Sequence, residues 1–385
     1  MKLAPTLVLA TVLVVSTLGR AAAQAPSRGQ AQGHDFIAEA KALLVVGACA
    51  QGAAPGVNPA IVATHCKKVR ATQDAYRTNW LNVARPFFAA HVPSNIPKVV
   101  VYPFAGGDLS TALTVFPDAD EITTLSLEPA GDPMALSNIT DRQLRSSLAT
   151  VATELGSLYR SNFSVTTNMI GAMRGGVLPT QLIFGLSALA LHGFEPVSLR
   201  YFQLTPEGDI RYLSDADIAT IGNVANRAKR NAELANIELR FRKIGHTKVQ
   251  VYRHIMANLD DAHLEESPAA LLHLQKKGKV AGMTKAASYL LTFDNFKTMR
   301  SYLIDHVTWM VSDSTGLLPT YGKPAGFEYE TWGSFDRSNM KAGRQVERTW
   351  RALFAEQPRR PLTFRFGYPD GKWRGHLVIM RRAAK

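Results

Sequence analysis

A strand, a glycine turn, a helix and a second strand follow one another between residues 98 and 128, and few folds accommodate that order. Residues 98–102 read Lys-Val-Val-Val-Tyr, a β-branched apolar run typical of a buried strand. A turn containing Gly106 and Gly107 comes next, and Asp108 or Ser110 can cap the helix that follows. A second apolar strand over residues 122–127 ends at Glu128. The order predicts a βαβ unit like one half of a nucleotide-binding Rossmann sheet.

The rest of the chain predicts an α/β or α+β fold, with a Rossmann-like N-terminal half and a mixed strand and helix second half. Residues 24–95 are expected to be a helical segment, residues 96–195 the α/β unit, and residues 196–385 the mixed half. Alternating apolar residues and turns predict two hairpins, 197–205 with 210–213 and 237–242 with 248–252. Helices are expected over 140–159, 177–191 and 285–310, and a closing strand pair over 362–367 and 376–380.

Residues 1–23 have the three parts of a secretory signal peptide. Lys2 gives a positively charged n-region, and residues 3–18 form an almost unbroken apolar h-region. Residues 21–23 are three alanines, which supply the small residues of a cleavage site before Gln24. The apolar stretch is 16 residues long, shorter than the ~20 residues of a spanning helix. We therefore expect cleavage before Gln24, a periplasmic or secreted mature protein, and no membrane span after cleavage. The alternative is an uncleaved N-terminal anchor.

The two cysteines, Cys49 and Cys66, lie in a predicted helix, loop and helix. In an exported protein such a pair is typical of one disulfide bond. Closing a loop of this size stabilises a fold by ~3 kcal/mol in the chain-entropy model. A catalytic thiol is the competing interpretation, but the spacing matches neither a redox nor a zinc motif.

The chain is basic, with a formal net charge of +13. Between Ser338 and Lys385 it has twelve Lys and Arg against three acids. In a cytosolic protein this would suggest nucleic acid. In an exported protein, the positive charge instead favours binding of an anionic polymer or a small acidic ligand, and we expect no nucleic acid as a partner. A solvated helix face is the structural alternative for the arginines at residues 344, 348 and 351.

The glycine turn is the first candidate binding site. Backbone can approach a ligand closely there, and Glu128 follows where a ribose-binding acid would sit. However, the G-x-G-x-x-G spacing is absent, the bulky Pro103 and Phe104 occupy the turn, and nucleotide cofactors are scarce outside the cytoplasm. We therefore expect no cofactor, and a structural role for Asp108 as a helix cap.

Signals for hydrolysis or metal binding are weak. The G-x-S-x-G motif is absent, and the S-x-x-K at residues 338–341 is expected by chance. A single Asp-Ser-Thr-Gly loop begins at Asp313, where an aspartic protease would need two, so an Asx-type turn is the simpler interpretation. The histidines form neither H-E-x-x-H nor H-x-H, and we expect no metal site.

Three segments resemble a family of exported bacterial proteins of unknown activity. They are the Tyr-Pro-Phe-Ala-Gly-Gly-Asp run that begins at residue 102, with Leu-Glu-Pro-Ala-Gly from residue 127; the Lys-Ala-Ala-Ser-Tyr run from residue 285; and the Ser-Asp-Ser-Thr-Gly run from residue 312. The resemblance implies no activity or cofactor. It does imply candidate site members: Tyr102, Asp108, Glu128, Lys285, Ser288, Tyr289 and Asp313.

Three functions follow as hypotheses. The first is a protein that binds a small or anionic ligand in a cleft over Gly106, Gly107 and Asp108. The second is a hydrolase that uses Asp108 and Glu128 as a carboxylate pair, with Lys285 and Asp313 as further catalytic candidates. The third is an envelope structural or interaction protein that docks through its basic C-terminus.

Overall fold

A computed structural model describes residues 33–162, 176–340 and 342–383. The predicted signal peptide lies outside these residues. From Gly33 onward the chain forms one compact unit with an α/β fold. None of the helices in the described ranges is both long enough and apolar enough to cross a membrane.

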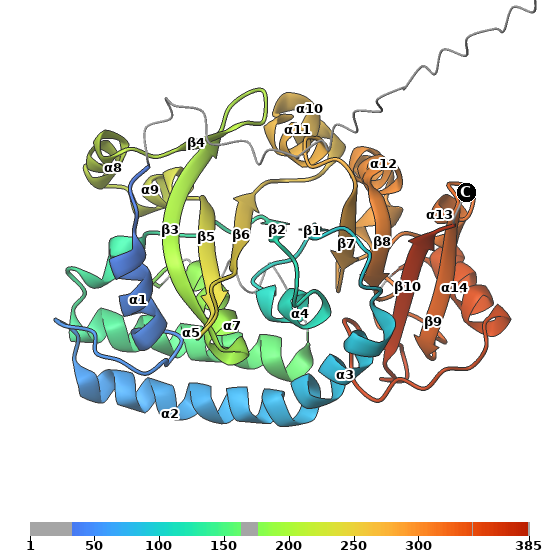
Figure 1. Cartoon of the computed structure of the whole chain (residues 1–385), viewed down its shortest axis with the longest axis horizontal. Helices are drawn as coiled ribbons and strands as arrows, with labels where there is room; N and C mark the ends of the chain where they lie inside the picture. Colours follow the sequence, from blue (N-terminus) through green and yellow to red (C-terminus); the bar gives the residue numbers. More distant parts are fainter. Residues whose placement is uncertain (1–32, 163–175, 341, 384–385) are drawn as a thin grey trace, which may run out of the picture. The chain divides into compact units, whose positions relative to one another are not determined.

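Within the described residues, ten strands form a single mixed sheet (Figure 1). In spatial order they are β4 (Ile210–Tyr212), β3 (Phe194–Leu204), β5 (Asn236–Lys243), β6 (Val249–Met256), β2 (Glu121–Ser126), β1 (Val99–Tyr102), β7 (Val280–Thr284), β8 (Val307–Ser312), β10 (His376–Arg382) and β9 (Phe327–Gly333).

The middle of the sheet is parallel, from β6 through β2, β1 and β7 to β8. Ranked by chain position, these five strands have the order 3-2-1-4-5, as in a Rossmann sheet. The order reverses between β1 and β7, and their carboxyl ends are the expected ligand edge. Because β7 and β8 come from the second half of the chain, the sheet runs continuously across the boundary expected near residue 195.

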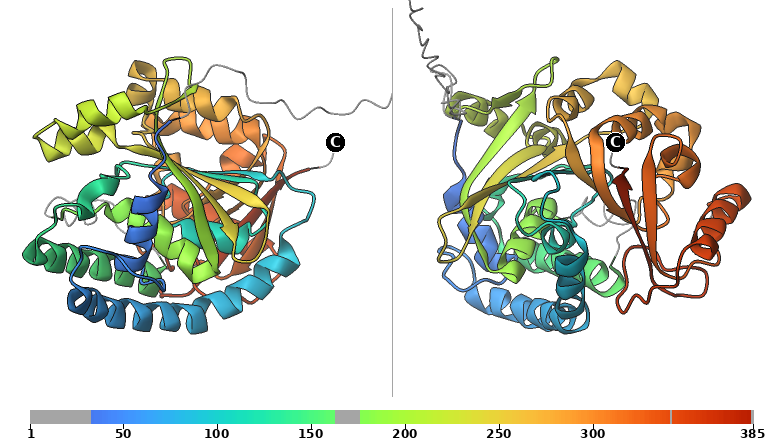
Figure 2. Two further views of the ribbon diagram at one scale, coloured as in Figure 1. Left: turned by 60° about the vertical axis from the view of Figure 1, so that its left-hand side comes forward. Right: turned by 45° about the vertical axis from the view of Figure 1, so that its right-hand side comes forward.

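Helices cover both faces of the sheet. Val100 and Tyr102 of β1 pack in one apolar cluster, with α1 (Ile37–Val46), α2 (Pro59–Tyr76), α3 (Asn82–His91), α4 (Leu109–Val115), α5 (Asp141–Ser161) and α7 (Thr180–His192). Val101, which points the other way, packs in a second cluster with α10 (Asp261–Glu266), α11 (Ala269–Gln275), α12 (Lys297–His306) and α14 (Arg344–Glu356). Both views of Figure 2 show α2 and α5 running side by side below the sheet.

The other helical segments in the described ranges are short. They are α8 (Asp215–Gly222), α9 (Arg227–Glu233), α13 (Pro319–Gly322), the π-helical turn Arg77–Leu81 and the 3₁₀ turns Pro133–Leu136, Leu290–Thr292 and Asp294–Phe296.

Most local predictions are confirmed: the βαβ unit, both hairpins and the helices at 140–159 and 177–191. Asp108 caps α4 by accepting a hydrogen bond from the backbone N–H of Thr111 at 3.3 Å. Two predictions were wrong. Only Lys297–His306 of the expected helix 285–310 is α-helical, since residues 307–312 form β8. Residues 362–367 form no strand, and β10 pairs with β8 and β9 instead.

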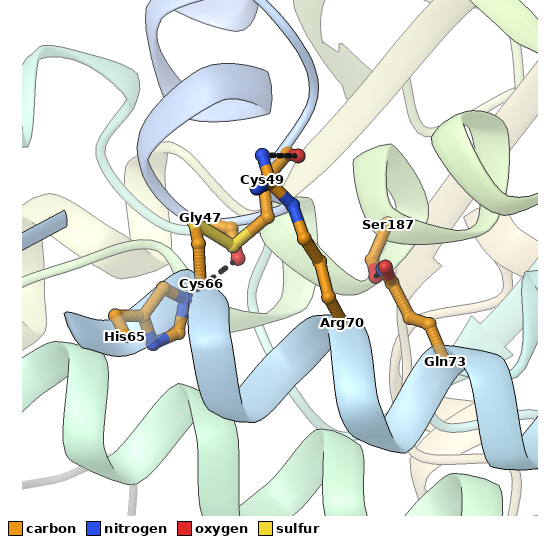
Figure 3. Close-up of a disulfide and its surroundings, with 7 residues drawn as sticks. All are labelled: Gly47, Cys49, His65, Cys66, Arg70, Gln73 and Ser187. Atoms are coloured by element: carbon orange, nitrogen blue, oxygen red, sulfur yellow. Dashed lines mark hydrogen bonds between the residues drawn. A yellow bond between two sulfur atoms is a disulfide. The ribbon is translucent and has the colours of Figure 1, made fainter. Parts of the chain in front are cut away.

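The predicted disulfide joins Cys49 and Cys66, whose Cα atoms lie 5.3 Å apart (Figure 3). It connects the loop after α1 to α2. Around it, Arg70 donates to the carbonyl of Cys49 at 3.2 Å, and the ring Nε2 of His65 lies 3.0 Å from the carbonyl of Gly47. Cys49, His65 and Cys66 hold potential metal ligands within 4.8 Å of one another, but the two sulfur atoms are bonded to each other.

Candidate functional site

A buried ion pair occupies the point where the strand order reverses. The ammonium of Lys285, just after β7, lies 2.5 Å from Oδ2 of Asp108, just after β1. The two residues are 3% and 4% exposed. Burial lowers the pKa of Lys285, and the carboxylate of Asp108 opposes that shift. The pair therefore joins two strands that are adjacent in the sheet but distant in sequence.

Asp108 is fully occupied by protein groups. Besides Lys285, it accepts hydrogen bonds from the Tyr102 hydroxyl at 3.2 Å and from the backbone and hydroxyl of Thr111 at 3.3 and 2.8 Å. Lys285 also donates to the Thr111 hydroxyl at 2.8 Å. A carboxylate with four protein partners serves as a cap and counter-ion, and these contacts weigh against its use as a general acid or base.

Asp313, which follows the neighbouring strand β8, is likewise surrounded by hydrogen-bond donors of the protein. Its Oδ2 accepts from the backbone N–H groups of Ala286 and Tyr368 at 3.0 and 2.8 Å. Its Oδ1 accepts from the backbone and hydroxyl of Thr315 at 2.9 and 2.5 Å, which is the predicted Asx-type turn. Gly367 faces this carboxylate so closely that an added Cβ would lie 2.0 Å from Oδ2. Asp313 thus ties three loops together.

The loop after β7 is strained. Ala286, Ser288 and Tyr289 have φ values of 53°, 50° and 59°, and none of them is glycine. Such residues cost of order 1–3 kcal/mol each and gather at sites that the surrounding structure holds in place. Here the anchors are the Asp313 contact and a 2.8 Å hydrogen bond between the hydroxyls of Tyr289 and Ser314. Ser288 is exposed.

The glycine turn is covered by α7. Gln181 donates from Nε2 to the carbonyl of Gly106 at 2.8 Å. A Cβ added at Gly107 would lie 2.0 Å from the ring of Phe184, so the glycine is needed for the helix to pack there. The close backbone approach that a nucleotide would use is made by a protein helix instead.

A cavity of about 560 Å³ lies beside the covered turn, at the carboxyl end of β2. It is lined by Glu128, Gln181, Arg227 and Asn231 among others, and Gly106, Gly107 and Asp108 are not part of its lining. Pockets of ~300–1,000 Å³ are typical of small-molecule sites. Its walls combine these polar groups with apolar surface from Leu127, Pro129, Leu178 and Pro179.

A buried histidine orients the cavity wall. His254 is fully buried, and burial lowers its pKa to about 4, so the ring is neutral at pH 7. Its Nε2 lies 2.7 Å from the carbonyl of Glu128, which makes Nε2–H the donor. Nδ1 is then an acceptor, 3.4 Å from Nε2 of Gln181. This fixes the orientation of Gln181 and leaves its Oε1 buried, with no hydrogen-bond partner in the described ranges.

The structure separates the sequence-predicted residues into three groups. Tyr102 and Lys285 both contact Asp108, Asp313 holds the loop of Ser288 and Tyr289, and Glu128 lines the cavity. Gln181 and His254 were missed, because neither belongs to a recognisable motif. Thr111 could have been found, since it lies three residues after the predicted cap Asp108.

Comparisons with family models, with curated proteins and with solved structures found no match.

Proposed function

We propose that this is an exported protein that binds a small polar molecule in the cavity at the carboxyl end of β2. The ligand class is an organic molecule with an N–H or O–H donor, from which the Oε1 of Gln181 would accept a hydrogen bond. The covered turn and the saturated Asp108 support a binding role over the carboxylate-pair hydrolase. Ligands of open α/β sheets bind at this edge.

One observation carries the proposal. Gln181 is 2% exposed and lines the cavity, and its Oε1 is a buried acceptor without a donor in the described part of the chain. Leaving such a group unsatisfied costs ~1–3 kcal/mol. A ligand donor seated in the cavity would remove that cost.

Export is supported by the disulfide, because such bonds persist mainly in oxidising compartments. It is also supported by the signal-like residues 1–23.

The test is native mass spectrometry of the protein purified from its own cell envelope or medium. We expect an additional small-molecule mass that is lost in Gln181→Met, which keeps the side-chain length and removes the acceptor. Gln73→Met is the matched control, because Gln73 is also buried, also donates a hydrogen bond from its side-chain amide (here to Ser187 of α7), and does not line the cavity. Protein without bound mass, or equal retention by both variants, would contradict the proposal.

A further inference from the structure

A second cavity, of about 750 Å³, lies at the opposite, amino-terminal edge of the parallel strands. Its walls come from α3, the end of α4, the residues before β1 and β2, and the turn between β5 and β6. This cavity is independent of the proposed ligand site, because the two share no lining residue.

The titratable side chains that line this cavity are mostly basic. Its titratable members are Arg85, Lys98, His192, Lys243, His246 and Lys248, against one acid, Asp118.

Three of these cations lack a carboxylate partner. Lys248 is neutralised by Asp120 at 2.7 Å. Arg85, Lys98 and Lys243 form no ion pair with any residue that the structure describes. These three cations outnumber the one acid of the lining, Asp118, and the excess positive charge creates a local potential that attracts anions.

Arg85 is held in place by a neutral histidine rather than by an acid. Its Nη2 donates to Nδ1 of His192 at 3.1 Å, and Nε2 of His192 lies 3.1 Å from the Ser110 hydroxyl. Burial, followed by the charge of Arg85, lowers the pKa of His192 to about 3. The hydrogen bond to the neutral ring therefore orients the Arg85 guanidinium without neutralising its charge, which can still attract a ligand.

The deeper lining is apolar. Phe88, Leu113 and Phe116 are buried and line the cavity together with Val92 and Ile96. A fully hydrated inorganic ion would gain nothing from this surface. An organic anion can place its apolar part there and direct its charged group to the cations.

We propose that this cavity binds an amphiphilic organic anion, with a carboxylate, sulfonate or phosphate-ester group facing Arg85, Lys98 and Lys243 and an apolar body against the half-buried Val92 and Ile96.

The test uses two fluorescent probes of similar shape, the anionic 8-anilinonaphthalene-1-sulfonate and its uncharged analogue N-phenyl-1-naphthylamine. We expect saturable binding of the sulfonate that weakens with added salt, and binding of the uncharged probe that is at least tenfold weaker. The triple variant Arg85→Gln, Lys98→Gln, Lys243→Gln should weaken sulfonate binding at least tenfold.

The matched control removes the same number of positive charges from exposed positions outside the cavity, as Arg344→Gln, Arg348→Gln, Arg359→Gln. It should bind the sulfonate within twofold of the unmodified protein. Equal binding of both probes would show an apolar site without charge recognition. Equal weakening in the two triple variants would show a general effect of net charge. Either result overturns the proposal, and loss in the control alone would assign the anion to the basic C-terminal helix instead.

Discussion

Replacing Lys285 by methionine should destabilise the protein strongly. The substitution keeps the length of the side chain but leaves Asp108 buried without its counter-ion. Breaking a buried pair from one side costs ~3–5 kcal/mol. That is a large part of the ~5–15 kcal/mol by which native domains are stable. Asp108 keeps its hydrogen bonds from Tyr102 and Thr111 in this variant. We therefore expect the free energy of unfolding to fall by about 3 kcal/mol, near the lower end of that range.

The double variant Lys285→Met, Asp108→Asn should recover most of this loss, because no unpaired charge remains and the asparagine can still cap α4. The assay is urea denaturation of the single and double variants at pH 7, followed by tryptophan fluorescence and circular dichroism. A loss below about 1 kcal/mol for Lys285→Met, or no recovery in the double variant, would refute the view that the pair is buried and coupled.

The variant Asp108→Asn alone adds a pH signature. Burial lowers the folded-state pKa of Lys285, and removing Asp108 takes away the interaction that opposes this. Between its folded-state and unfolded-state pKa values, Lys285 is protonated mainly in the unfolded chain. The free energy of unfolding of this variant therefore rises with pH up to the unfolded-state pKa near 10.5. We therefore expect the deficit of Asp108→Asn relative to the unmodified protein to shrink between pH 7 and pH 10. A constant deficit would contradict this.

Further predictions concern other parts of the fold. Replacing Cys49 and Cys66 by serine should cost ~3 kcal/mol, measured by denaturation with peptide mapping of the disulfide as the check. Gly107→Ala should cost ~1–3 kcal/mol because its Cβ meets a buried ring of α7; Gly222→Ala, in open space, should be neutral or stabilising. His254 has a folded pKa of about 4 against 6.5, so its contribution is complete above pH 6.5 and about 3 kcal/mol is lost as pH falls to 4. His254→Gln should flatten that part of the stability curve, and an unchanged slope would count against this assignment.

Short sequence patterns correctly predicted the strands and helices that are specified by residues close together in the chain. The βαβ unit and the hairpins have strand periodicity bounded by Gly, Pro or Asp, and each of these signals specifies a structure within about 30 residues. The prediction of one helix over residues 285–310 was wrong because its apolar residues are divided among several elements. These are a strained turn, two 3₁₀ turns, helix α12 and strand β8. The turn takes positive φ values at Ala286, Ser288 and Tyr289, and without glycine nothing marks it in the sequence.

The sequence predicted some residues of the candidate site, but not Gln181 and His254 and not the arrangement of the site. Asp108 and Lys285 meet because β1 and β7 are neighbours, and Asp313 reaches the loop after β7 from the neighbouring β8; that strand order depends on pairing between distant segments. Glu128 lies one strand away, in a wall completed by Gln181 of α7. Nothing in the sequence indicates that α7 closes the turn at Gly106, because that closure depends on how Gln181 and Phe184 pack.

The Lys285 and Asp108 pair also bears on the time course of folding. Asp108 is synthesised well before Lys285, so until the second half of the chain follows, the centre of the sheet has a carboxylate without its counter-ion and β1 without its neighbour β7. Pairing of such distant segments is slow. We therefore expect the first half to stay incompletely folded until the second is available, which, under the export proposed above, would keep the growing chain competent for translocation.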